Sequence, residues 1–148
     1  MRIKLHFQTR IDAEAALVRQ PLRLIRLLAQ VRFPTAEGWS RSRTAILDTG
    51  NPVSILPHSI WRELAPPPTQ GLRRRLRGIG TSEEATVSGV LGRVHILFHD
   101  DRNSSEPFAV SAFLLDNDVA PLLIGFEDVL TRAILHCDYP ASLAYLDL

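Results

Sequence analysis

Alternation of apolar and polar residues with a period of two is the feature of this 148-residue sequence that most restricts its fold. The pattern covers residues 3–7, 25–33, 92–98 and 108–114. Because successive side chains of a β-strand point to opposite faces, each stretch predicts a strand with one buried face.

The remaining segments are short and are separated by turn-forming residues. Residues 34–43 read as a hairpin loop, and segments 72–80 and 85–89 lead into and out of a polar loop. Further strands are expected at 44–47, 122–124, 133–137 and 143–148, and short helical turns at 11–20, 58–64 and 127–131. The sequence therefore predicts a mostly β domain with one or two short helices.

Composition narrows the class of protein. A net charge of +1 gives the chain no nucleic-acid-binding footprint, and 45% hydrophobic residues argue against disorder. No stretch reaches the roughly 20 apolar residues of a membrane span. Cys137 is the single cysteine, so no intrachain disulfide can form and a reducing compartment is expected. These features predict a cytoplasmic domain that binds neither nucleic acid nor membrane.

Three segments carry the functional signal. Ala45-Ile46-Leu47-Asp48-Thr49-Gly50 places a carboxylate directly after an apolar strand. An ordinary turn is one interpretation, since Asp and Gly are favoured there, and a catalytic carboxylate at a strand end is the other. Downstream lie the glycine-rich segment 77–81 and the apolar run 122–124, which ends at Gly125 and leads into residues 127–130.

Taken in this order, the three segments resemble the retropepsin-like aspartic proteases in their single-domain bacterial form. The first matches the Asp-Thr-Gly active-site motif, the second resembles the flap that closes over substrate, and the third resembles the second hydrophobic-hydrophobic-Gly motif with its helix. The resemblance covers residues 24–148 and leaves 1–23 as an N-terminal extension. It implies a closed or partly open β-barrel of the retropepsin-like acid protease type.

The resemblance implies a catalytic role for Asp48, Thr49 and Gly50. Two carboxylates in contact share one proton, so one can accept a proton from water while the other gives one to the peptide carbonyl. Aspartic proteases are the established example of such a pair. Thr49 would hydrogen-bond across to the partner loop, and Gly50 would allow close approach. Water is the attacking group, so neither a metal nor an organic cofactor is expected.

The chain contains one Asp-Thr-Gly, whereas a bilobal enzyme would need about twice this length. A two-fold homodimer in which each chain contributes Asp48 would supply the second carboxylate. Terminal strands interleave in retroviral relatives, so residues 143–148 are the candidate dimer strand, although the N-terminal extension could change the interface.

The substrate is expected to be a peptide or protein bound as an extended strand between the flap and the two carboxylates. Residues 77–89 are expected to form the mobile flap hairpin. The residues expected to contact substrate are Ile46, Asn51, Gly78, Ile79, Gly80, Thr81 and Leu123.

Some positions depart from the family pattern. Asn51 stands where the family often has Ala or Ser, and Phe126-Glu127 stands where many relatives have Arg-Asp or Arg-Asn. The supporting arginine interaction is therefore absent or replaced, and the flap tip at 80–84 is more acidic than the retroviral one. Two alternatives stay open: a catalytically silent peptide-binding or assembly domain with this fold, and a structural β domain with a chance Asp-Thr-Gly.

Other candidate sites are weaker. His95 and His99 have the spacing of a helical zinc pair, but four strand residues span about 13 Å, too far for one metal. The arginine-rich segment 73–77 is expected to be a solvated strand face. Cys137 is expected to be a packed core thiol.

Overall fold

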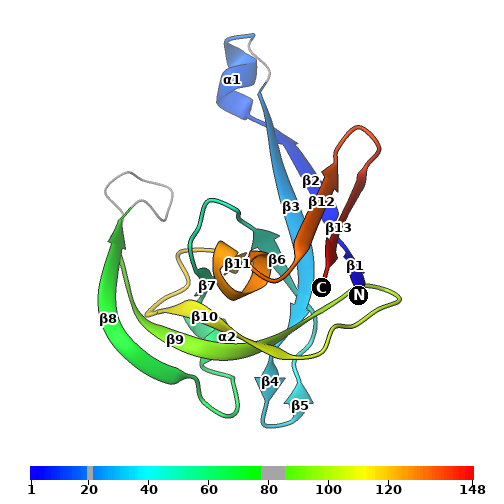
Figure 1. Ribbon diagram of the computed structural model, residues 1–148. Coiled ribbons are helices and arrows are strands. Elements are labelled where there is room, and N and C mark those ends of the chain that lie inside the picture. Colours follow the sequence, from blue (N-terminus) through cyan, green and yellow to red (C-terminus); the bar gives the residue numbers. More distant parts are fainter. Residues whose placement is uncertain (20–21, 78–85) are drawn as a thin grey trace.

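Strands make up most of the described chain (Figure 1). The structure is a computed structural model that describes residues 1–19, 22–77 and 86–148. The strands are β1 (Arg2–Lys4), β2 (His6–Ile11), β3 (Arg23–Arg32), β4 (Pro34–Thr35), β5 (Gly38–Trp39), β6 (Arg43–Leu47), β7 (Ser54–Leu56), β8 (Thr69–Arg77), β9 (Thr86–His99), β10 (Phe108–Leu115), β11 (Leu123–Ile124), β12 (Ile134–Asp138) and β13 (Leu143–Asp147). The helical segments are α1 (Ala13–Leu17), α2 (His58–Trp61) and the irregular turn η1 (Phe126–Leu130). The prediction of a mostly β protein with short helices is confirmed.

Most strands belong to one eight-stranded sheet with the order β2-β3-β6-β11-β7-β10-β9-β8. An additional pairing joins β3 to β9. A second sheet has the order β1-β13-β12, and β4 with β5 forms a small hairpin. In Figure 1, β8 and the start of β9 curve along the left of the molecule, and the three-stranded sheet lies on the right.

The core consists of two groups of buried side chains. The larger group joins both sheets and includes Phe33 and Phe98, together with Ile3 and Leu5 from the start of the chain. The smaller group lies around Ile55. Residues 1–23 therefore begin with side chains that are part of the main core.

Several elements differ from their predicted extents. The alternating stretch 3–7 forms two strands, because the Leu5 N–H donates to the Ala144 carbonyl and the chain changes sheets there. The described residues 86–89 and the segment 92–98 belong to the single strand β9, and the loop 34–43 contains the β4–β5 hairpin. Among the described residues, no helix is long and apolar enough to span a membrane.

The three-stranded sheet changes two expectations about the C-terminal region. β13, the candidate dimer strand, pairs with β1 on one side and β12 on the other, so both of its backbone edges are occupied within the chain. Cys137 lies on β12, the outer strand, and is exposed. The prediction of a packed core thiol is therefore wrong, because little of β12 is covered by the body of the protein.

Candidate active site

The Asp48 loop begins where β6 ends. The Asp48 N–H donates to the Ile124 carbonyl at 2.9 Å, and the Asp48 carbonyl accepts from the Asn51 N–H at 3.3 Å. The carboxylate Oδ1 of Asp48 accepts the Gly50 N–H at 2.9 Å. Asp48 is half-buried, whereas Thr49 and Gly50 are exposed. The loop is thus fixed by its backbone while the motif faces solvent.

The strand that supports this loop is β11. It pairs in parallel with β6 and antiparallel with β7, so it lies between the two strands that the loop connects. Beyond β11, the Phe126 N–H donates to the Asn51 carbonyl at 2.8 Å, and the Glu127 N–H donates to the Pro52 carbonyl at 2.9 Å. The third motif of the sequence therefore lies directly against the first.

Gly125 makes this close approach possible. A Cβ at Gly125 would lie 2.3 Å from the carbonyl carbon and oxygen of Val53, well inside contact distance. The Gly125 N–H donates to the hydroxyl of the fully buried Ser54 at 3.2 Å. By contrast, a Cβ at Gly50 would meet Asp48 Oδ1 at 3.4 Å, an ordinary contact. The fold of the single chain thus requires glycine at 125 but not at 50.

Two of the expected substrate contacts lie side by side. Leu123 is in register with Ile46 on one side and Ile55 on the other. Because alternate strand residues share a face, Ile46 lies on the same face of β6 as Asp48. Leu123 also packs on the smaller core group, which reaches the strands β8 and β9. The expected flap contacts Gly78, Ile79, Gly80 and Thr81 lie outside the described residues.

Asp128 is a buried carboxylate that sequence reasoning missed. Its Oδ2 accepts the Ser111 N–H at 2.8 Å and lies 3.4 Å from Arg93, and its Oδ1 lies 3.8 Å from Arg132. Burial raises the pKa of Asp128, but the Ser111 hydrogen bonds and the two arginines outweigh this and hold it below its ordinary value.

The sequence predicts that the supporting arginine interaction is absent or replaced, and arginines from other positions lie in this region. Position 126 is an exposed Phe, and Arg93 and Arg132 pair with Asp128 instead. No sequence pattern indicates that Asp128 is buried while its neighbour Glu127 is exposed. The difference arises because the Asp128 carboxylate accepts an N–H from a strand that is distant in the sequence. Glu127, with ψ of 141°, and Asp128, with a positive φ of 64°, both have non-helical backbone angles, so η1 is not a regular helix.

The other candidate sites remain separate from Asp48. His95 and His99 both lie on β9, and His99 hydrogen-bonds Ser42 at 2.9 Å. Within the described ranges, no three His, Cys, Asp or Glu side chains form a group able to hold a metal. Arg73, Arg74 and Arg75 are exposed, which confirms the solvated strand face for these three residues.

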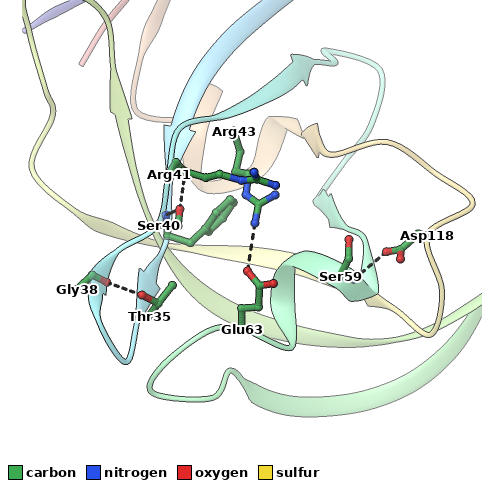
Figure 2. A network of polar contacts seen from close by, with 9 residues as sticks. Thr35, Gly38, Ser40, Arg41, Arg43, Ser59, Glu63 and Asp118 are labelled. Carbon is green, nitrogen blue, oxygen red and sulfur yellow. Dashed lines mark hydrogen bonds and ion pairs between the residues drawn. The ribbon is translucent and has the colours of Figure 1, made fainter.

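The start of β6, at the end opposite Asp48, is held by polar contacts (Figure 2). Arg43 pairs with Glu63, just beyond α2, at 3.1 Å. The Ser59 N–H on α2 donates to Asp118 at 2.8 Å, and this hydrogen bond lowers the pKa of Asp118. β6, the strand that leads into Asp48, is therefore held by contacts at both of its ends.

The sequence matches no family model and no curated protein. The resemblance to retropepsin-like proteases therefore rests on the three sequence motifs.

Proposed function

We propose that the chain is a retropepsin-like aspartic endopeptidase that works as a homodimer, with one Asp48 from each chain activating the attacking water. The observation that carries this proposal is the Asp48 loop, whose backbone is fixed against Gly125 while Thr49 and Gly50 stay exposed. Both residues are available to a second copy of the loop, as a shared pair of carboxylates requires.

The strand arrangement supports the family's barrel. The additional β3–β9 pairing links two strands that otherwise lie far apart in the order of the sheet. With it, pairings run continuously through β3, β6, β11, β7, β10 and β9 and back to β3. Such a circuit leaves few free edges and places the Asp48 loop at one end of the strands.

The face around Asp48 supports a peptide substrate. Ile46 and Leu123 are both half-buried and adjacent in register, so they offer an apolar surface next to the carboxylate. Hydrophobic side chains beside the cleaved bond would bind there. An extended peptide would add its backbone to the flap as a further strand.

The Asp48→Asn variant tests the proposal. It removes the ionisable proton carrier but keeps the size of the side chain, so hydrolysis of a peptide library should fall by orders of magnitude while folding and dimerisation persist. A statine-type inhibitor should block cleavage, and chelators should not.

The exposed Asp101 provides a matched control, since Asp101→Asn makes the same chemical change away from the motif. This variant should cleave as the wild type does. The alternative is a catalytically silent peptide-binding or assembly domain. It is favoured if purified wild type cleaves nothing from acidic to neutral pH yet binds peptides as well as Asp48→Asn does.

A further inference from the structure

A pocket of about 620 Å³ lies beside the β4–β5 hairpin, at the end of β6 opposite Asp48. Its walls come from the hairpin, from the segment that leads into β6, and from Glu63 just beyond α2. Trp39 lies on the hairpin, and Arg41 and Arg43 line the side next to β6. The described lining does not include the Asp48 motif, so the pocket is separate from the candidate active site.

Arg43 is the more enclosed of the two arginines, with a side chain that is 22% exposed. Its Nη2 donates to Glu63 at 3.1 Å, whereas its Nε is buried and has no hydrogen-bond partner among the described residues. A guanidinium has five N–H donors, and a buried donor without a partner costs free energy. Arg43 therefore has hydrogen-bonding capacity that the described chain does not use.

Arg41 brings a second positive charge to the pocket. It is exposed and forms no ion pair with any described residue. In Figure 2 the side chains of Arg41 and Arg43 converge on the same region, and both line the pocket. Glu37, the other carboxylate of the lining, is exposed at the tip of the hairpin and pairs with neither arginine in the described chain. Because like charges repel, an added anion between the two arginines would be stabilised.

Trp39 adds an aromatic surface to the pocket. It is in register with Pro34 on the hairpin, and 43% of its surface is exposed. An exposed indole in a hollow can pack against the ring of a ligand, whereas a free inorganic ion would make no use of it. The pocket thus combines two cationic side chains with one aromatic surface.

We propose that this pocket binds a small molecule in which a carboxylate or phosphate group is attached to an aromatic ring. The anionic group would lie between Arg41 and Arg43, whose planar guanidinium groups match two oxygens of either anion. Because the charge of a guanidinium is delocalised, the anion need not reach the buried Nε of Arg43. The ring would pack on Trp39.

Nuclear magnetic resonance titrations of the full chain with phenyl phosphate, benzoate and inorganic phosphate test the site. The first two probes compare the two anionic groups on the same ring, and the third lacks the ring. Wild type should bind phenyl phosphate or benzoate with a Kd in roughly the millimolar range, as small ligands do, and should bind inorganic phosphate more weakly. The proposal is overturned if neither aromatic probe binds.

Arg41→Gln should weaken binding of the preferred aromatic probe at least about fivefold, because it removes the unpaired cation. Arg75→Gln is the matched control, since Arg75 is exposed on β8, away from the pocket, and it should bind as the wild type does. Equal affinity of wild type and Arg41→Gln would show that the probe binds elsewhere.

Two further variants separate the ring contact from the charge contact. Trp39→Ala should reduce the advantage of phenyl phosphate over inorganic phosphate, and an unchanged advantage would contradict packing on Trp39. Glu63→Gln should tighten binding, because it removes the carboxylate that competes for Arg43. Weaker binding by folded Glu63→Gln would contradict an anion at Arg43.

These titrations do not depend on the protease proposal. The pocket and Asp48 lie at opposite ends of β6, so Asp48→Asn should bind the probes as the wild type does. A probe that no longer binds to Asp48→Asn would place its site at the motif instead and overturn the pocket.

Discussion

Gly125 is the residue at which the candidate site tolerates added size least. It follows β11, which lies between β6 and β7, and the loop joining those strands passes over it. Its N–H reaches the buried hydroxyl of Ser54, so the contact is polar as well as close. The position of the Asp48 loop therefore depends on the absence of a side chain at 125.

Gly125→Ala should lower the free energy of unfolding by about 2 kcal/mol or more, because the Val53 carbonyl and its neighbours must move to admit the methyl group. Denaturant unfolding of dilute protein measures this loss. Gly50→Ala is the control and should change stability by no more than about 0.5 kcal/mol, since its methyl group meets an ordinary contact. Equal losses in both variants would contradict the steric argument.

At the same scale, local sequence patterns singled out Asp48 and Gly125 for the candidate site but not Ser54 or Asp128. The first two belong to short local patterns, an apolar run followed by Asp-Thr-Gly or by Gly. The hydrogen bonds of Ser54 and Asp128 join residues 71 and 17 positions apart, respectively. Their roles therefore come from tertiary contacts that no local pattern encodes.

Asp128 joins three elements. It belongs to η1, its carboxylate accepts the Ser111 N–H of β10, and it pairs with Arg93 of β9. Ser111 and Arg93 are themselves opposite one another in the β9–β10 register. The segment that follows Gly125 is thereby attached to the two strands behind it.

This attachment should depend on pH. Because the pKa of Asp128 is lowered by folding, its contribution is fully present above its ordinary value of 3.8 and is lost as pH falls through the lower folded-state value. In an Asp48→Asn background, Asp128→Asn should cost about 1–3 kcal/mol at neutral pH, and the difference should shrink below about pH 4. Unfolding free energies measured across this range give the comparison.

The neighbouring, exposed Glu127 supplies the control for the same loss of charge. Glu127→Gln should change the neutral-pH stability by no more than about 0.5 kcal/mol. A destabilisation by Asp128→Asn that is the same at pH 2 and pH 7 would show that the carboxylate charge does not hold η1.

Element by element, alternation predicted the strands well because burial of one face imposes it directly. Alternation did not predict where the chain passes from one sheet to the other, as at Leu5. It also did not predict which part of the protein covers a given face of a strand. Cys137 is opposite the buried Ala144 and still exposed, because coverage at the edge of a sheet depends on the rest of the fold. Local patterns carry no information on that coverage.

For the whole molecule, the described residues form a buried core, and the Asp48 motif proposed as the active site lies exposed at the end of β6. The described chain gives the Asp48 carboxylate one hydrogen bond, from Gly50 in the same loop. The glycine at 50 is not required by its own chain, because a Cβ there would meet only an ordinary contact. The proposed second copy of the chain would account for both features.

Mixing of subunits distinguishes a shared site from two separate ones. When equal amounts of wild-type and Asp48→Asn chains exchange freely, about one quarter of the dimers carry two Asp48 residues. If both carboxylates are needed, activity should fall to about one quarter of that of wild type at the same total concentration. A site complete within each chain would retain about one half of the wild-type activity. That result would contradict a pair of carboxylates shared between two chains. Replacing Asp48→Asn by Asp101→Asn in the mixture should leave activity unchanged, because both chains then keep Asp48.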